Sequence, residues 1–430
     1  MNRIVKNSFW IIACKVLQML LNLIVTMLTA RYLGPSNYGL ISYAASVVTF
    51  VVPVMQLGLR STLVQELVNG PDKEGEILGT AVVMNIIGAF ACIVGIISFT
   101  FLVNTGETET IIVCGLYSIS LFFQATEMIQ YWFQAKLESK YPSMAMVASY
   151  VVVSAYKIYL LVSGKNVYWF AVSQAIDAAL ISLILFWFYK KKGDQKLRFS
   201  WKLGKAMYAK SKYYIISGLM VNIFQLTDRI MLKLMLGDEI TGYYSAAVAC
   251  AGLSSFVFQA IIDSSRPSIL FEHGHDKEKF GNNVSNLFSV IFYLSLVQCV
   301  GICVLAKPII LILYGNQYLN AVPALRLVVW YTSFSFLGTV RNIWILAEGK
   351  QSVLWKINMV GAMANVVLNY FMIPHWGIHG AAIASVFTQF FTNVIIGEII
   401  VQIRPCNRLL YSGIHPKRIV RLVKKTLKRG

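Results

Sequence analysis

Apolar stretches and short polar turns alternate along the whole chain. About 20 consecutive apolar residues make a helix that crosses the roughly 30 Å hydrocarbon core of a bilayer. We identify twelve such stretches. They cover residues 8–30, 40–59, 77–103, 111–132, 143–163, 167–189, 213–235, 243–262, 286–306, 321–346, 353–374 and 378–403. The pattern predicts an all-α polytopic membrane protein with about twelve transmembrane helices.

Part of this pattern is repeated. The segment Leu21–Gly58 recurs 203 positions later. The matched positions are Leu33 with Leu236, Gly34 with Gly237, Gly39 with Gly242, Ser42 with Ser245 and Ala44 with Ala247. We therefore expect two repeat-related bundles of six helices each.

The basic stretch 190–212 is the largest interruption of the apolar pattern. We interpret it as a cytoplasmic linker between an N-terminal six-helix bundle at 1–189 and a C-terminal six-helix bundle at 213–403. A basic tail at 404–430 follows. Because each bundle has an even number of crossings, both enter the membrane from the same side, and the repeat axis should run along the membrane normal.

Composition agrees with a membrane protein. Of the 430 residues 57% are hydrophobic and 13% are charged, and the mean hydropathy is +0.63. A soluble surface needs more charges than this. Cysteines lie mostly within the apolar stretches and form no CxxC pair, so they are interpreted as small packing residues.

The distribution of cations predicts the orientation. Short loops rich in Lys and Arg stay in the cytoplasm. With both termini in the cytoplasm, 29 of the 38 Lys and Arg residues fall in inner segments and five within spans. Four are assigned to outer loops: Arg31, Lys165, Lys233 and Lys307. A net charge of +19 on a soluble chain would suggest nucleic acid. Here the positive charge marks the cytoplasmic face, and no nucleic-acid partner is expected.

The tail has two interpretations. From Pro416 onward, Val420, Val423 and Leu427 recur at helical spacing among Lys and Arg residues. This spacing is typical of a basic amphipathic helix on the anionic inner leaflet, with membrane lipids as partners. A disordered solubilising tail is the alternative.

Polar side chains follow one face of several predicted helices. Ionisable residues within spans are costly, and they normally line a cavity or contact one another. One face of the first helix carries Lys15, Gln18, Asn22, Thr26 and Thr29. The repeat-related helix carries Gly218, Asn222, Gln225 and Arg229, and two more such faces are Tyr117, Ser120, Gln124, Glu127, Tyr131 and Gln134, and Asn358, Asn365 and Asn369.

These faces predict a wet cavity between the two bundles. The alternative is that the polar groups join helices by hydrogen bonds without a cavity. The candidate substrate-binding residues are Lys15, Asn22, Lys157, Gln225, Arg229 and Arg341. The candidate ion-coupling residues are Glu127, Asp177 and Asp228. The deep spans hold five cations against three acids, which favours an anionic substrate such as a diphosphate.

Five short motifs carry a family resemblance. They are RYLGPSNYG at 31–39, LGDEITGYYSAA at 236–247, LYGNQYLNAVPALRLV at 313–328, ILAEGKQ at 345–351 and LNYFMIPHWGIHGAAIAS at 368–385. In this order the chain resembles the polysaccharide-biosynthesis flippases, the Wzx type of the multidrug/oligosaccharidyl-lipid/polysaccharide exporter superfamily.

The resemblance implies a V-shaped pair of six-helix bundles that work by alternating access in the bacterial plasma membrane. It implies transport of an undecaprenyl-diphosphate-linked oligosaccharide from the inner to the outer leaflet for O-antigen or capsule assembly. The expected partners are the lipid-linked oligosaccharide and the polysaccharide polymerase machinery. A cation-coupled multidrug exporter of the same superfamily is the alternative function.

An enzyme is not expected. The sequence contains no nucleotide-binding GxxxxGK[ST] loop and no HExxH zinc motif, and the outer loops are too short to carry a catalytic site. His273 and His275 could suggest a metal site, but two histidines in a loop are more often solvated. We expect no metal and no cofactor other than H⁺ or Na⁺ coupling.

Overall fold

The computed structural model describes residues 3–427, except for the side chains of residues 3–17, 20, 423 and 425–427. The described residues form helices and no strands. Contacts divide the chain into two compact units, Met1–Leu226 (unit 1) and Thr227–Gly430 (unit 2). The division falls inside a helix, whereas the sequence analysis places its boundary in the basic stretch 190–212.

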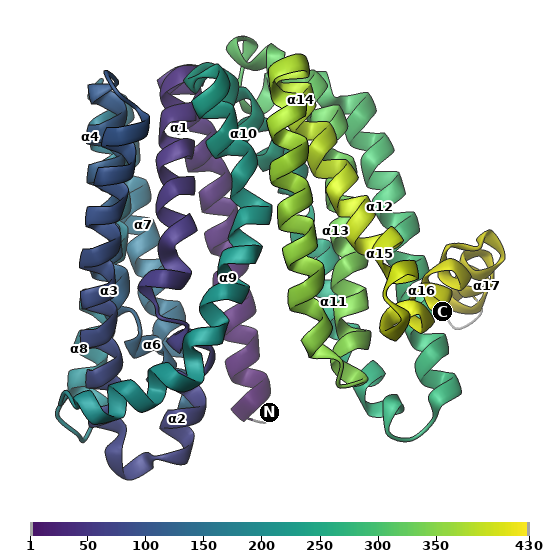
Figure 1. Ribbon diagram of the computed structural model, residues 1–430, viewed down its shortest axis with the longest axis horizontal. Helices are drawn as coiled ribbons and strands as arrows, with labels where there is room; N and C mark the ends of the chain where they lie inside the picture. The colour runs from purple at the N-terminus through teal and green to yellow at the C-terminus, as the bar shows by residue number, and fades with distance from the viewer. Residues whose placement is uncertain (1–2, 428–430) are drawn as a thin grey trace. The chain divides into compact units, whose positions relative to one another are not determined.

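Figure 1 labels the α-helices. Unit 1 contains α1 (Arg3–Met55), α2 (Leu63–Asn69), α3 (Glu74–Val103), α4 (Thr108–Ser118), α5 (Ser120–Thr126), α6 (Ile129–Ala135), α7 (Lys140–Val162), α8 (Val167–Lys192) and most of α9 (Trp201–Leu236). Unit 2 contains the end of α9, then α10 (Asp238–Gly252), α11 (Ser255–His273), α12 (Lys277–Leu313), α13 (Val322–Ala347), α14 (Leu354–Phe390), α15 (Ile396–Ile399), α16 (Arg404–Ile414) and α17 (Pro416–Leu427). A π-helix at Phe391–Ile395 and short 3₁₀ turns at Leu59–Ser61, Pro71–Lys73, Asn316–Ala321, Gln351–Val353 and Val401–Ile403 complete the elements.

The number of membrane-spanning helices follows from the helix breaks. Nine described segments are long and apolar enough to cross a membrane, and the pair α10 and α11, bent by 42°, makes ten. Two of the ten contain a glycine with non-helical φ/ψ, Gly34 in α1 and Gly377 in α14. The helical segments on both sides of each glycine are long enough to cross the membrane. Division at these glycines gives the twelve spans that the sequence predicts.

The repeat is visible in the backbone. Gly34 has φ 74° and ψ 172°, and its repeat partner Gly237 has φ 91° and ψ −176°. This conformation is essentially restricted to glycine. In each unit it ends one helix and begins the next, so the repeated glycines mark equivalent turns.

One predicted span is less regular than expected. The stretch 111–132 is divided among α4, α5 and α6. Hydroxyl groups bond to carbonyls of the preceding turn near both breaks: Ser118 Oγ donates to Gly115 O and Thr126 Oγ1 donates to Phe123 O, each at 2.7 Å. Such bonds compete with the helical pattern and bend helices.

Part of the basic stretch 190–212 packs on α3. The backbone N–H of Arg198 donates to Gly75 O at 3.1 Å, and Gln195 accepts from Gly75 N at 2.9 Å. A Cβ at Gly75 would lie 2.4 Å from Lys196 O. The glycine therefore permits the close approach, and α9 begins already at Trp201.

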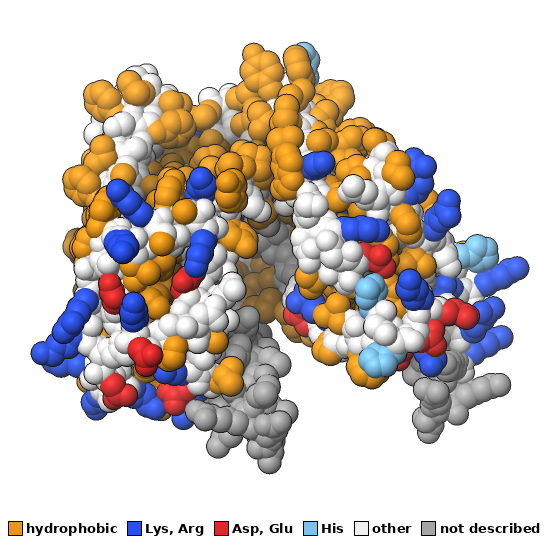
Figure 2. Space-filling view, turned by 60° about the horizontal axis from the view of Figure 1, so that its bottom comes forward, with side chains coloured by type: hydrophobic (Ala, Val, Ile, Leu, Met, Phe, Trp, Pro, Cys, Tyr) orange, Lys and Arg blue, Asp and Glu red, His pale blue; other side chains and the backbone are white. Residues whose placement is uncertain are grey.

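Large apolar side chains face outward on the long helices. Phe90, Phe101 and Leu102 of α3 and Val297 and Val304 of α12 are each at least 65% exposed. Figure 2 shows hydrophobic side chains over much of each unit, with Lys and Arg side chains gathered toward the end that this view brings forward. Exposed apolar surface on this scale is typical of a lipid-facing protein, and the chain is a multi-pass membrane protein.

Candidate functional site

The most buried acidic centre lies in unit 2, around Asp228 of α9. Its carboxylate accepts hydrogen bonds from Asn365 Nδ2 at 3.2 Å and Asn369 Nδ2 at 2.7 Å, both from α14. It also accepts from Tyr244 Oη of α10 and from Ser385 Oγ in the second half of α14. Three helices thus converge on one carboxylate, and we call these five residues the Asp228 cluster.

The Asp228 cluster is buried, and the hydrogen bonds to its carboxylate come from neutral groups. Asp228 is 6% exposed and Asn369 is fully buried. All four donors are neutral, and no ion pair joins Asp228 to a cation in the part of the chain that the structure describes. The Oδ1 atom of Asn369 is buried without a hydrogen-bond partner. A buried charge or acceptor without a partner is costly, so the cluster is chemically suited to receive a small cation.

Arg229 follows Asp228 in α9, and its charge lies close enough to Tyr244 of the cluster to interact with it. It is half-buried, and its Nε atom is buried without a hydrogen-bond partner among the described residues. Tyr331 of α13 is close enough to interact electrostatically with both Asp228 and Arg229. The candidate substrate cation and the candidate coupling acid thus share a neighbourhood within unit 2.

A second acidic centre lies in unit 1, around Asp177 of α8. Ser149 Oγ of α7 donates to its carboxylate at 2.6 Å. Lys157 and Glu127 both lie close enough to Asp177 to interact with it electrostatically. All three ionisable residues are half-buried. The structure therefore brings together three candidates that the sequence could only name separately, and we call these four residues the Asp177 cluster.

Arg341 lies apart from both clusters, in the core of unit 2. It is 5% exposed, and its Nη1 atom donates to the backbone carbonyl of Thr392 in the π-helix. A π-helical turn leaves carbonyls free from the α-helical pattern. The Nε atom of Arg341 is buried without a partner, so this cation has one structural contact and unused hydrogen-bonding capacity.

The remaining candidates do not join either cluster. Asn22 and Gln225 are exposed, and Asn22 Oδ1 accepts from Thr26 Oγ1 at 2.9 Å. The side chain of Lys15 lies outside the described residues. Asn222, on the same predicted face as Gln225, donates Nδ2 to Thr49 O at 2.7 Å and so joins α9 to α1 within unit 1.

A polar groove in unit 1 was missed by sequence reasoning. It has a volume of about 370 Å³, and its lining includes Gln56 and Arg60, which follow α1, and Asn222 of α9. The sequence feature that could have indicated the groove is a pair of glycines, Gly58 and Gly218, which permit close approach of the segment 53–58 to α9. A Cβ at Gly58 would lie 2.3 Å from Ser211 O, and one at Gly218 would lie 2.8 Å from the Pro53 side chain.

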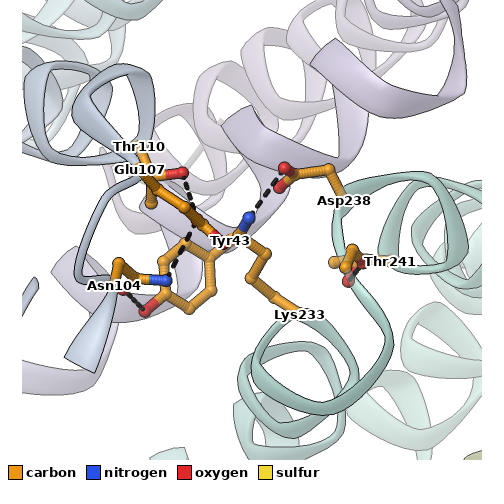
Figure 3. A network of polar contacts seen from close by, with 8 residues as sticks. Tyr43, Asn104, Glu107, Thr110, Lys233, Asp238 and Thr241 are labelled. Atoms are coloured by element: carbon orange, nitrogen blue, oxygen red, sulfur yellow. Dashed lines mark hydrogen bonds and ion pairs between the residues drawn. The ribbon is translucent and has the colours of Figure 1, made fainter.

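Two further polar networks were also missed. In unit 1, Tyr43 Oη donates to Asn104 Oδ1 at 2.9 Å, and Glu107 accepts from Asn104 and Thr110 (Figure 3). In unit 2, Lys233 Nζ lies 2.7 Å from Asp238 Oδ2. Lys233 was assigned to an outer loop, but it lies in α9 and is only 4% exposed.

The two loop histidines have local partners. His273 Nε2 lies 3.3 Å from Glu348 Oε1, and His275 Nδ1 lies 2.8 Å from Phe271 O. Within the described residues, no group of three or more His, Cys, Asp and Glu side chains is arranged to hold a metal ion.

A family model matches this chain. The family model described as "Polysaccharide biosynthesis protein" matches residues 4–270. This is more than half of the chain, and the chain belongs to this family. The family resemblance seen in the sequence motifs is confirmed.

Two curated relatives match this chain over most of both lengths. The capsular polysaccharide biosynthesis protein CapF of Staphylococcus aureus is 18% identical, with 90% of this chain and 96% of CapF covered. A putative O-antigen transporter of Shigella flexneri is 22% identical, with 89% and 94% covered. An uncharacterized membrane protein of Methanocaldococcus jannaschii is 27% identical over 60% of this chain, which spans about half of that relative's length (52%).

Solved structures define the fold. The lipid II flippase MurJ in an inward closed conformation is 15% identical with a TM-score of 0.73, covering 96% of this chain and 92% of that one. A multidrug resistance MATE family transporter in an inward-facing conformation is 14% identical with a TM-score of 0.72, covering 93% and 96%. The chain has the fold of these alternating-access transporters, as the sequence analysis expected.

Proposed function

We propose that this protein is a flippase that moves lipid-linked oligosaccharides across the bacterial plasma membrane for surface polysaccharide assembly. The substrate is an undecaprenyl-diphosphate-linked repeat unit, carried from the inner to the outer leaflet. Family membership supports the polysaccharide pathway. The observation that supports the transport mechanism is the Asp228 cluster, a buried carboxylate held by neutral hydrogen-bond donors inside a transporter fold.

The diphosphate would be recognised by cations within the spans. Arg229 has an unused Nε–H, and a guanidinium can bind two phosphate oxygens at once, whereas Lys15 offers a point charge. Lys15 lies in the inner half of its predicted span and Arg229 in the outer half of its own. We therefore assign them to opposite stages of passage. Asn22, Lys157, Gln225 and Arg341 are the secondary candidates for contacts with the substrate.

Coupling to H⁺ or Na⁺ would use the Asp228 cluster. When a proton binds Asp228, one carboxyl oxygen becomes a donor, and a flip of the Asn369 amide would present its Oδ1 atom as the acceptor. When Na⁺ binds instead, the carboxylate and amide oxygens supply the hard ligands that such a cation requires. Either event neutralises Asp228, and it changes the bonds that join α9 to α10 and α14. Glu127 and Asp177 are the corresponding candidates in unit 1.

The function can be tested by complementation in a capsule- or O-antigen-producing strain that lacks its own flippase. The wild-type chain should restore surface polysaccharide and prevent accumulation of lipid-linked repeat units inside. Arg229→Gln should reach the membrane at normal level, block assembly and leave lipid-linked units inside. Normal complementation by this variant would remove Arg229 from the site, and loss of the protein itself would indicate a folding role.

A multidrug exporter is the second candidate, because the fold is shared with a MATE transporter. The two functions differ in what accumulates when the gene is deleted. A flippase deletion leaves lipid-linked sugars inside and drug susceptibility unchanged. Increased susceptibility to cationic drugs, with normal surface polysaccharide, would favour the exporter.

The proposed orientation, with both termini in the cytoplasm, has its own test. Single cysteines introduced between residues 104 and 109 or at Gly377 should react with a membrane-impermeant reagent in intact cells. Cysteines within 190–212 should react only after the cells are opened. Labelling of 190–212 in intact cells would show that this segment lies outside, and the proposed orientation would be wrong.

A further inference from the structure

The C-terminal helices enclose a basic groove with the beginning of α12. The groove has a volume of about 740 Å³. The lining residues used below are Lys279, Asn282, Asn286, Lys417, Arg418 and Arg421. None of the described residues that line the groove is acidic. A cavity lined by cations and amides is suited to an anion.

The groove is built by firm docking of α16 on α12. Ser285 Oγ donates to Leu409 O at 3.0 Å, and Tyr293 Oη donates to Ile414 O at 2.7 Å. A Cβ at Gly413 would lie 2.7 Å from Ser285 O, so only glycine permits this approach. The segment that leads into α17 is therefore held in place within unit 2.

Arg418 of α17 is held in the groove by neutral acceptors. Its Nε atom donates to Asn286 Oδ1 at 2.8 Å, and one Nη atom donates to Asn282 Oδ1 at 2.9 Å. Its other Nη atom donates to Ser412 Oγ at 2.7 Å. Partial burial and the charge of Arg421 lower the pKa of the Arg418 guanidinium. The described part of the chain places no carboxylate on Arg418, so an oriented positive charge remains without a counterion.

Asp276, an acid close to Lys279, serves as the N-cap of α12. Its side chain accepts from the backbone N–H groups of Glu278 and Lys279, and lies 3.3 Å from Lys279 Nζ. These bonds to Lys279 hold the pKa of Asp276 below its ordinary value. Lys279 is thus partly compensated, whereas Lys417 and Arg421 are exposed and have no ion-pair partner among the described residues.

The position of the groove indicates the source of the anion. Lys279, Asn282 and Asn286 lie in the first three turns of α12, which is long and apolar enough to cross a membrane. The groove therefore lies at the level of the lipid headgroups on its side of the membrane. The neighbouring helix α17 alternates cations with Ile419 and Val420, and Val420 is 51% exposed. An amphipathic basic helix at this depth is typical of contact with anionic lipid.

We propose that the groove between α12 and α16–α17 binds the phosphate of an anionic membrane lipid, with Lys417 and Arg421 as the contacting cations and Arg418 as the oriented centre. The bound lipid fastens the C-terminal helices to the membrane surface beside α12. This site is independent of the transported substrate, and it makes the stability of unit 2 dependent on lipid composition.

Native mass spectrometry of the full-length protein in neutral detergent tests the proposal, with phosphatidylglycerol and phosphatidylcholine of identical acyl chains as probes. The wild type should bind phosphatidylglycerol preferentially, and the preference should weaken as salt screens the charges. Lys417→Gln/Arg421→Gln should weaken phosphatidylglycerol binding about 25-fold, since each cation contributes about fivefold near an anionic surface. Arg418→Gln should weaken it as well.

Two matched controls distinguish loss of the binding site from a general loss of positive charge and from misfolding. Lys190→Gln/Lys202→Gln removes two exposed cations from unit 1 and should leave the lipid preference intact. The thermal midpoints of Lys417→Gln/Arg421→Gln and of the unit 1 control in phosphatidylcholine should equal that of the wild type. An unchanged lipid preference in the Lys417→Gln/Arg421→Gln protein overturns the proposal, as does an equal loss in the unit 1 control.

A third arm distinguishes lipid from soluble anions. Inorganic phosphate and pyrophosphate at millimolar concentration should displace phosphatidylglycerol only weakly, because they lack the acyl chains that hold the headgroup against α12 and α17. Complete displacement by either soluble anion would show that the groove is a site for free phosphate, and the lipid assignment would be wrong.

Discussion

The Asp228 cluster and the Asp177 cluster differ in how a carboxylate inside the protein is stabilised. In unit 2, Asp228 is almost fully buried and is surrounded by four neutral donors. In unit 1, Asp177 is half-buried, has one neutral donor, and lies near Lys157 and Glu127. Asp177 has the cation Lys157 nearby, whereas every hydrogen bond to Asp228 comes from a neutral donor. For this reason we propose the Asp228 cluster, ahead of the Asp177 cluster, as the ion-coupling centre.

The largest expected effect is from Asp228→Asn. The amide cannot take a proton or bind a cation strongly, so transport should fall by about 100-fold or more, and its remaining rate should lose dependence on pH and Na⁺. Surface polysaccharide and lipid-linked units in cells measure the rate. Asp177→Asn is the matched control and should keep the pH and Na⁺ dependence of the wild type. If Asp177→Asn removes that dependence and Asp228→Asn does not, the assignment of the two units is reversed.

Removal of one member of the unit 1 pair should have the next largest effect, on stability. Asp177→Asn leaves Lys157 without its nearby carboxylate, and an uncompensated, partly buried cation should destabilise the protein by about 1–3 kcal/mol. The double variant Asp177→Asn/Lys157→Gln should recover part of this loss, since contacting residues couple by about 0.5–3 kcal/mol. Thermal unfolding in detergent measures both. Strictly additive losses would show that the two residues do not form a pair.

The neutral donors should tune the Asp228 cluster more gently. Tyr244→Phe or Ser385→Ala removes one hydrogen bond to the carboxylate, a change of about 1–2 kcal/mol. We expect the concentration of Na⁺ or H⁺ that half-saturates transport to shift by several-fold, with maximal transport preserved. The corresponding change in unit 1, Ser149→Ala, should leave the cation dependence unaltered. An equal shift from Ser149→Ala would remove the distinction between the clusters.

The smallest effect tests the repeat itself. Gly237→Ala places a side chain in a backbone conformation that strains L-residues by about 1–3 kcal/mol. No atom lies within 4 Å of the added Cβ, so strain is the only cost. Gly34→Ala should destabilise the protein by a similar amount, because the two backbones match. A difference of several kcal/mol in thermal stability between the two variants would show that the turns are not equivalent.

The number and approximate positions of the spans could be predicted from the sequence because they depend on local properties. Transfer of about 20 apolar residues into lipid is decided within each stretch, and the turns at Gly34-Pro35 and Gly237-Asp238 are marked by short polar motifs between apolar stretches. Residues 111–132 were predicted as one continuous helix because a hydropathy pattern does not show the hydrogen bonds from Ser118 and Thr126 hydroxyls to backbone carbonyls near the breaks. Lys233 was misplaced for a related reason, since hydropathy alone cannot show that Asp238 accompanies it into the interior.

The acidic candidates were also visible in the sequence, but their environments were not. Charge within an apolar stretch is enough to single out Asp177 and Asp228, and the face shared by Asn365 and Asn369 follows from helical periodicity. By itself the chain therefore determined an all-α membrane protein, the repeat and a short set of polar residues. Only the tertiary structure decided that Asn365 and Asn369, 137 and 141 positions away, bond to Asp228, and that Lys157 lies near Asp177. The reason is physical: hydropathy and periodicity are properties of one helix, whereas compensation of a buried charge depends on which helices pack together.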